Sequence, residues 1–169
     1  ITINFDPISA KKVRFIQTDL PWDSEYKNLF IKRIEFLSYE ERYSKGVFST
    51  FIEENETHDP HKCPVHITSS FSDFDSFFMV DSKKHIDSGG LKDQWFQIEL
   101  LHGSAILTGC RIKSIINRLK SFKIICTDDV SKPMEEWTTL LEIYDKPKEE
   151  HTQIQTYEFK EQSPNTKFV

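Results

Sequence analysis

The amino-acid sequence predicts an all-β fold in which antiparallel strands form a sandwich. From residue 46 onward, short apolar runs alternate with polar, turn-forming segments, which is the spacing expected of a sandwich. The chain lacks the regular alternation of strands with helices that a parallel α/β sheet would require. The predicted strands cover residues 46–52, 65–71, 77–80, 95–100, 105–116, 121–127, 137–144 and 153–159.

The first 43 residues differ in pattern from the rest of the chain. We interpret residues 1–43 as an N-terminal extension or linker that packs on a sandwich formed by residues 44–169. Residues 12–18 are expected to be extended, as are residues 1–5, and residues 21–24 are expected to turn.

Two patterns compete between residues 25 and 43. Apolar residues at three-and-four spacing slightly favour an amphipathic helix, whereas a partial two-residue period fits a strand. The helical pattern consists of Tyr26, Leu29, Phe30, Ile34 and Leu37. The competing period uses Leu29, Ile31, Leu37 and Tyr39.

The clearest alternation along the chain begins at residue 106. One set of side chains can face a core while the set between them meets solvent. The core-facing set is Ile106, Thr108, Cys110 and Ile112, followed in the next strand by Phe122, Ile124 and Cys126. Lys120, Lys123 and Thr127 are expected to mark the solvent positions and the ends of that next strand.

Composition argues against two classes of partner. The chain has 22 Lys and Arg residues against 27 Asp and Glu residues, a net charge of −5, whereas nucleic-acid binding needs a clustered basic surface. No apolar run approaches the roughly 18 residues that a membrane span requires. We therefore expect no nucleic-acid partner and no membrane span.

The three cysteines, Cys63, Cys110 and Cys126, cannot all pair with one another. Cys110 and Cys126 fall inside apolar strand-like runs, where a small buried thiol is common. We interpret the cysteines as reduced and expect a cytoplasmic protein. One disulfide with one free thiol is the alternative.

Four segments in order resemble the strand motifs of the F5/8 type C domains, which are also called discoidin-like or galactose-binding-like domains. The first runs from an aromatic residue to Ile-Glu-Leu, the second has a Gly before Ile-x-Ser, the third enters an Asp-Asp turn, and the fourth is Trp-x-x-Leu. These segments are residues 95–100, 106–114, 119–129 and 137–140. Residues 46–48, 60–61 and 67–70 extend the likeness, which is closest to the domains that follow BTB domains in intracellular protist proteins.

The resemblance implies a jelly-roll sandwich of about eight main strands whose loops at one end hold the ligand. Members of the family bind proteins, sugars or phospholipid head groups, and the fold often holds a structural calcium ion, so no catalytic site and no other cofactor is implied. The chain departs from the family at Cys110, where Tyr is usual, and at Asp128, where Asn is usual. It also lacks the paired terminal cysteines of secreted discoidin domains.

Several residues that could bind a metal ion or stack on a sugar are interpreted as structural. His58, His61, Cys63 and His66 offer four zinc-ligand types, but their spacing matches no standard zinc site, so we interpret them as part of a loop. Asp128 and Asp129, with Glu135 and Glu136 nearby, are interpreted as a turn between strands. Trp95 and Trp137 could stack on sugars, but core or edge packing is favoured.

The function predicted from sequence is that of a protein-binding domain within a larger intracellular protein, and not that of an enzyme. A carbohydrate-binding module is the alternative, and it would need an exposed aromatic ring beside a convergent Arg, His or Asp set. The basic residues from Arg111 to Lys123 are interpreted as a solvated face, and a positive strip on adjacent strands for an acidic partner is the alternative. The candidate ligand-binding residues are Trp22, Phe74, Phe77, Phe78, Arg111 and Lys113.

Overall fold

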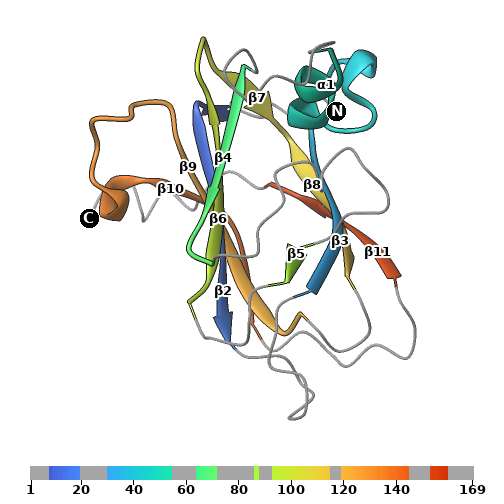
Figure 1. The fold of residues 1–169 in the computed structure, drawn as a ribbon, viewed down its shortest axis with the longest axis vertical. Helices are drawn as coiled ribbons and strands as arrows, with labels where there is room; N and C mark the ends of the chain where they lie inside the picture. Colours follow the sequence, from blue (N-terminus) through green and yellow to red (C-terminus); the bar gives the residue numbers. More distant parts are fainter. Residues whose placement is uncertain are drawn as a thin grey trace, which may run out of the picture.

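The computed structural model describes residues 8–19, 30–54, 64–71, 86–87, 93–114, 119–144 and 153–159 (Figure 1). Strands dominate these residues, and one α-helix, α1 (Val47–Glu54), accompanies the short 3-10 helices η1 (Glu41–Tyr43) and η3 (Met134–Glu136). The strands are β1 (Ile8–Ala10), β2 (Lys12–Asp19), β3 (Phe30–Leu37), β4 (Val65–Ser69), β5 (Ile86–Asp87), β6 (Trp95–Leu100), β7 (Ala105–Leu107), β8 (Gly109–Ser114), β9 (Ser121–Thr127), β10 (Thr138–Ile143) and β11 (Gln153–Glu158).

The described strands form two large sheets and one small one, and every pair of neighbours is antiparallel. A five-stranded sheet has the order β10-β9-β2-β6-β4, and a four-stranded sheet has the order β11-β8-β3-β5. Strands β1 and β7 form a separate pair. The predicted all-β sandwich is confirmed, while its jelly-roll connectivity stays a prediction.

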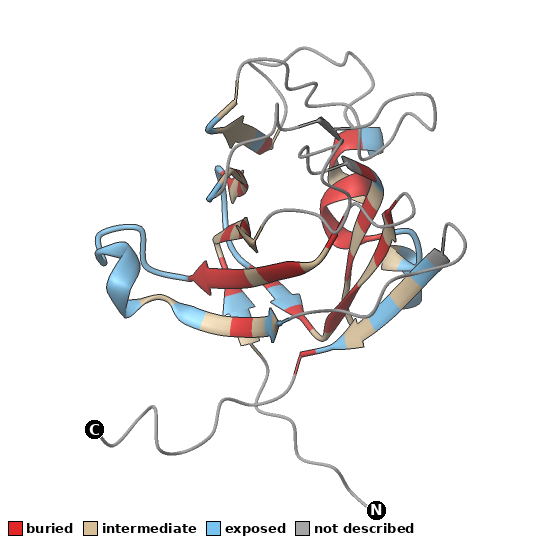
Figure 2. Cartoon of the chain, turned by 90° about the horizontal axis from the view of Figure 1, so that it is seen from below, coloured by how far each residue is buried: buried red, intermediate tan, exposed pale blue. Residues whose placement is uncertain are grey.

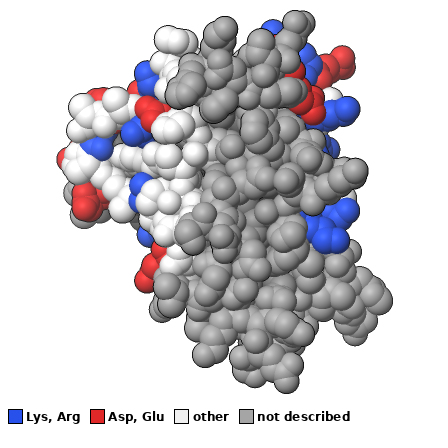
Figure 3. Space-filling view, in the orientation of Figure 1, with Lys and Arg blue, Asp and Glu red and all other residues white. Residues whose placement is uncertain are grey.

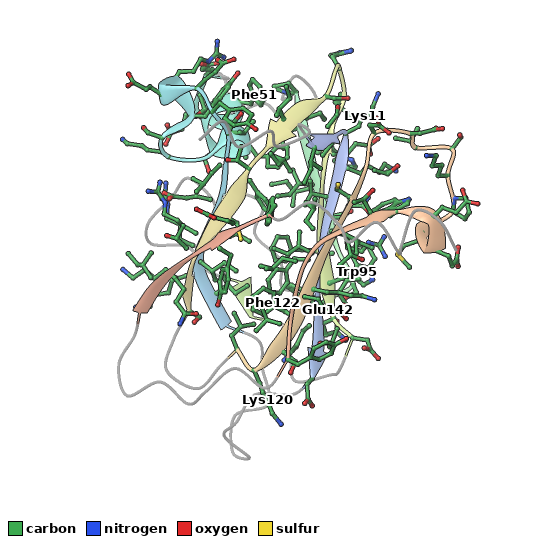
Figure 4. All side chains as sticks on the ribbon, turned by 180° about the vertical axis from the view of Figure 1, so that it is seen from behind. Lys11, Phe51, Trp95, Lys120, Phe122 and Glu142 are labelled. Atoms are coloured by element: carbon green, nitrogen blue, oxygen red, sulfur yellow. The ribbon has the colours of Figure 1, made fainter. Side chains whose placement is uncertain are left out.

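Aromatic rings from three strands form the centre of the core. Phe15 stacks on Phe96 and on Phe122, with ring centroids 5.1 Å apart in both pairs. Phe122 in turn meets Tyr157 of the other sheet edge to face at 5.7 Å, so the aromatic core joins the two sheets. Figure 4 shows Phe122 between the sheets, and Figure 2 shows buried residues concentrated on the strands that face one another.

The predicted helix between residues 25 and 43 is wrong where the structure describes this segment. Residues 30–37 form strand β3, which pairs with β8. A register shift lies between Ile31 and Arg33, so the buried side chains Ile31, Ile34 and Phe36 are spaced by three and then by two residues. The bulge breaks the two-residue period, which explains why the strand pattern fitted this segment only in part.

The predicted boundary between residues 43 and 44 does not separate the described strands. β2 lies in the middle of the five-stranded sheet, between β9 and β6, and β3 lies between β8 and β5. Strands from both sides of residue 44 therefore share both large sheets. The described residues before 44 are part of the sandwich rather than an extension that packs on it.

The strand predicted at residues 46–52 is instead helix α1. Val47, Phe48 and Ile52 are buried, a spacing that places them on one face of a helix. Gly46 precedes the helix with a φ of +102°, a conformation that favours glycine. The ring of Phe48 meets Phe36 edge to face at 5.4 Å, so the helix covers one end of the core.

The predicted run 105–116 is divided into β7 and β8 at Thr108. Cys110 and Ile112 are buried as predicted, but in β7 the pattern is reversed, with Leu107 buried and Ile106 42% exposed. Thr108 belongs to neither strand, so the alternation restarts after it. Thr127, predicted to mark a solvent position or the end of its strand, is buried at the end of β9.

The buried thiols agree with the reduced state expected for two of the cysteines. Cys110 and Cys126 are free and buried in different sheets, whereas Cys63 lies outside the described residues. Burial, together with the charge of Asp128, raises the pKa of Cys126 to about 12, and burial raises the pKa of Cys110 further. No helix among the described residues is long and apolar enough to cross a membrane.

Candidate functional site

A cluster of aromatic and cationic side chains lies on the outer face of the five-stranded sheet. The guanidinium carbon of Arg14 lies 3.8 Å from the ring centroid of Trp95 and 5.9 Å from that of Trp137. Its Nε and Nη2 donate to Oε1 of Gln97 at 3.1 and 2.9 Å, and its Nη1 donates to Sδ of Met134 at 3.2 Å. We call these five residues the Trp–Arg surface.

The register between β2 and β6 brings this surface together. Arg14 lies opposite Gln97, and Ile16 lies opposite Trp95. Because successive side chains of a strand point to opposite faces, the complete burial of Phe15 in the core puts Arg14 on the outside. The outer side chains of two central strands therefore meet directly.

The segment between β9 and β10 supplies Met134 and Trp137. It projects from the side of the sandwich and is largely exposed (Figures 1 and 2). Oδ1 of Asp129 accepts hydrogen bonds from the hydroxyl of Ser131 at 2.6 Å and from its N–H at 3.0 Å, which hold the pKa of Asp129 below its usual range. Asp129 is thus a turn residue, as predicted, and Nε1 of Trp137 donates to the carbonyl of Lys132 at 3.2 Å.

Arg14 keeps its charge although it is partly removed from water. Burial lowers the pKa of Arg14, but a guanidinium stays protonated at neutral pH. Three of its five N–H groups are bonded within the Trp–Arg surface. Among the residues that the structure describes, no carboxylate forms an ion pair with Arg14. Its remaining N–H groups are therefore suited to an acceptor from a ligand.

The two tryptophans are surface residues rather than members of the core. Trp95 and Trp137 are both half-buried. The interpretation of Trp95 as core or edge packing is wrong, because β6 lies inside its sheet and the ring meets Arg14 on the outer face. Trp137 directly precedes β10, an edge strand, with Met134 44% exposed nearby.

The alternative of a positive strip is wrong for the described basic residues, because they lie on two sheets. Arg111 and Lys113 belong to β8 in the four-stranded sheet, whereas Lys120 adjoins and Lys123 belongs to β9 in the other sheet. Nε of Arg111 also donates to Oε2 of Glu35 at 2.8 Å. Figure 3 shows basic and acidic side chains interspersed over the described part of one face, with no field of a single sign.

Arg111 connects elements of the fold through its guanidinium. Besides its bond to Glu35, it donates through Nη2 to the carbonyl of Ser44, in the turn after η1. The other carboxylate oxygen of Glu35 accepts from Nε of Arg33 at 2.9 Å. This network links β3, β8 and the turn, while a ligand-binding role for Arg111 and Lys113 stays a prediction.

The other predicted ligand-binding residues, Trp22, Phe74, Phe77 and Phe78, lie outside the described residues. So do three of the four potential zinc ligands, namely His58, His61 and Cys63. The fourth, His66, is exposed on β4. Within the described part of the chain, no group of three or more His, Cys, Asp or Glu side chains could hold a metal ion.

A cavity of about 250 Å³ opens beside the end of β11. On the outer face of the four-stranded sheet, Gly109 lies in register between Leu37 and Glu158, and all three residues line the cavity. Of the described lining residues, Glu158 alone is charged. The apolar and aromatic part of the lining includes Ile8, Leu37, Tyr39, Leu107, Tyr157 and Phe159.

One buried polar side chain stands apart from these features. Gln17 is fully buried on the core side of β2, and neither Oε1 nor Nε2 has a hydrogen-bond partner among the residues that the structure describes. A buried amide without partners costs about 1–3 kcal/mol.

We expect Gln17→Met, which keeps the length of the side chain, to raise the free energy of unfolding by about 1–2 kcal/mol in urea titrations. A decrease of similar size would instead indicate that the amide binds a buried water molecule.

Sequence reasoning missed Arg14 and Gln97 as site residues. The signal was present in the alternation of β2, where Lys12 and Arg14 flank Val13 and precede Phe15. It marks Arg14 as an outward-facing residue, but it does not reveal that Gln97 lies opposite it.

No protein-family model, curated protein or solved structure matches this chain.

Proposed function

We propose that this chain is a non-enzymatic protein-binding module of a larger intracellular protein, and that the Trp–Arg surface holds an acidic segment of the partner. The observation that carries the proposal is Arg14, a charged group set between two indole rings with no ion pair among the described residues. Arg and Trp are the residue types that contribute most to binding energy at protein interfaces. A partner carboxylate would accept from the free N–H groups of Arg14.

The surroundings of Arg14 suit a protein partner. Met134 is 44% exposed and Val130 is 47% exposed, and both belong to the projecting segment that carries Trp137. Apolar side chains around a charged centre exclude water when a partner binds, which strengthens the central ion pair. The surface therefore combines a cationic centre with an apolar rim.

The discoidin-like motifs support a binding role rather than a catalytic one. Residues 95–100 and 137–140, two of the four motifs, supply Trp95, Gln97 and Trp137 to the Trp–Arg surface. The chain carries neither a Gly-x-Ser-x-Gly elbow nor a phosphate-binding loop with its Lys. A structural calcium ion, which the resemblance implies, plays no part in the proposed contact.

A carbohydrate is the second candidate ligand, because two indole rings converge here with Arg14 and Gln97. A sugar ring stacks on an open aromatic face, however, and the guanidinium of Arg14 already covers one face of Trp95 at 3.8 Å. Trp137, at 5.9 Å from the same group, is less covered. The geometry therefore favours the protein partner.

The test uses an array of eight-residue peptides in which one Asp or Glu is flanked by apolar residues, beside the same peptides with Asn or Gln. We expect the protein to bind the acidic set, and Arg14→Gln to weaken that binding at least about 10-fold, as loss of one charged contact predicts. Trp137→Ala should weaken it as well. Affinities are measured by fluorescence anisotropy.

Lys32→Gln is the matched control, since Lys32 is an exposed residue of β3 in the opposite sheet and its loss changes the net charge equally. It should leave the affinity unchanged. Equal binding by Arg14→Gln and the unmodified protein would contradict the proposal. Sugar binding on a glycan array that is lost in Arg14→Gln, without peptide binding, would replace it with the carbohydrate candidate.

A further inference from the structure

Four described strands lie at the edges of the two large sheets, and three of them carry a feature that discourages pairing with another chain. β10 has a register shift between Thr139 and Leu141, and β5 has two residues. β4 follows Pro64 and contacts α1. β11 differs from them, because its six residues pair with β8 in an unbroken register and include neither Lys nor Pro.

The backbone of β11 presents hydrogen-bonding groups away from β8. Phe159, directly after β11, donates its N–H to the carbonyl of Thr108 at 2.9 Å. In an antiparallel pair, bonded and non-bonded residues alternate, so Tyr157 and Gln155 also face β8. The N–H and C=O groups of Ile154, Thr156 and Glu158 therefore point toward the open edge.

The side chains along this edge are accessible. Ile154 is 65% exposed, and Thr156 and Glu158 are exposed as well. Figure 2 shows β11 at the margin of the molecule, with its exposed and half-buried residues in alternation. Within the described chain, β8 is the one strand beside it.

The cavity described above adjoins the same edge. Thr156 and Glu158 are among its lining residues, together with Tyr39, which is 60% exposed. Its volume of about 250 Å³ lies below the roughly 300–1,000 Å³ of pockets for drug-sized ligands, so it suits a single side chain. The edge of β11 thus combines outward-pointing N–H and C=O groups with a cavity that suits one side chain.

We propose that β11 binds an extended peptide segment of a partner protein, which adds a strand to the four-stranded sheet and inserts one apolar side chain into the cavity. Only a peptide backbone supplies donors and acceptors at the spacing of Ile154, Thr156 and Glu158. This site lies on the other sheet from the Trp–Arg surface and does not rest on the function proposed for that surface.

Charge defines the partner segment further. Glu158 is the charged residue among the described lining residues, so the cavity has a carboxylate at its edge. Residues two apart on a strand share a face. The segment therefore carries a Leu or Phe that enters the cavity and a Lys or Arg two positions from it that pairs with Glu158.

The probe is a set of capped eight-residue peptides of alternating Thr and Val, with Leu, Phe or Ala at a central position and Lys, Gln or Glu two residues away. Peptides with Leu or Phe and Lys should bind at least about 10-fold more tightly than those with Ala or with Glu. On binding, amide hydrogen exchange should slow at Ile154, Thr156 and Glu158. The amides of Gln155 and Tyr157, which already face β8, should change little.

Thr156→Pro removes an N–H that points to the open edge, where proline is tolerated, and should abolish binding. Thr156→Val keeps this N–H and should bind normally. Glu158→Lys, an exposed change that does not alter the backbone, should reverse the preference from Lys to Glu peptides even if the proline variant folds poorly.

Three outcomes would overturn the proposal. One is that none of the peptides binds, and another is that they bind without the alternating protection of β11. The third is concentration-dependent dimerisation of the protein that Thr156→Pro abolishes, measured by sedimentation, because the edge would then belong to a second copy of this chain.

Discussion

Replacing Gly109 by alanine is expected to lower the free energy of unfolding by about 3 kcal/mol. A Cβ atom at this position would lie 2.4 Å from the carbonyl oxygen of Tyr157, closer than real contacts allow. That oxygen belongs to the backbone of β11, so the clash is relieved only if β8 and β11 move apart. Urea or thermal unfolding of the purified variant measures the loss.

Gly103→Ala is the matched control for this prediction. Gly103 has a φ of +75°, but among the described residues, its chain neighbours apart, no atom lies within 4 Å of the position that the methyl group of alanine would take. Alanine at this position would be strained by the positive φ but would not clash. The change should therefore lower the free energy of unfolding by about 1 kcal/mol. If Gly109→Ala were as mild as Gly103→Ala, β8 and β11 would not approach each other as closely as the structure has them.

The sequence predicted β6 and β9 with their observed boundaries, and physical reasons explain why. Each strand has one face in the core, so a regular two-residue alternation extends along its length. Phe96 and Ile98 of β6, and Phe122 and Ile124 of β9, are all buried. The local sequence pattern is sufficient to predict a strand and its boundaries when one face of a regular strand is buried along its whole length.

The same reasoning failed where the pairing is irregular. The bulge in β3 changed the spacing of Ile31, Ile34 and Phe36, so the two-residue period of a strand was broken there and the helical pattern was preferred. Helix α1 was predicted as a strand because its eight residues are too short for periodicity to distinguish the two. Both errors arise because packing against the rest of the fold, rather than the local sequence pattern, determines the structure of β3 and α1.

The candidate site depended on contacts that no local pattern contains. Arg14 and Gln97 are 83 residues apart, and only the register between β2 and β6 brings them together. Conversely, Arg111 and Lys123 are close in sequence, but β8 and β9 enter different sheets. The sequence therefore favoured a packing role for Trp95 and Trp137, because it did not show the cation that lies beside them.

Replacing Phe15 by alanine is expected to lower the free energy of unfolding by about 3–5 kcal/mol, a large share of the roughly 5–15 kcal/mol of a typical domain. Phe15 is fully buried and stacks on Phe96 and Phe122, so the variant leaves a cavity between the two sheets. Chemical unfolding followed by tryptophan fluorescence measures the change. Ile16→Ala, on the outer face of the same strand, should cost about 1 kcal/mol.

The position of Phe15 also predicts the result of a truncation. Residues 44–169 alone lack β2 and β3, which supply inner strands to both large sheets, so they should show no cooperative unfolding transition. The central aromatic stack would lose its middle ring, and β9 and β6 would lose the strand that lies between them. A cooperative transition of near-native stability would mean that residues 1–43 are an extension after all, and Phe15→Ala would then have to be mild.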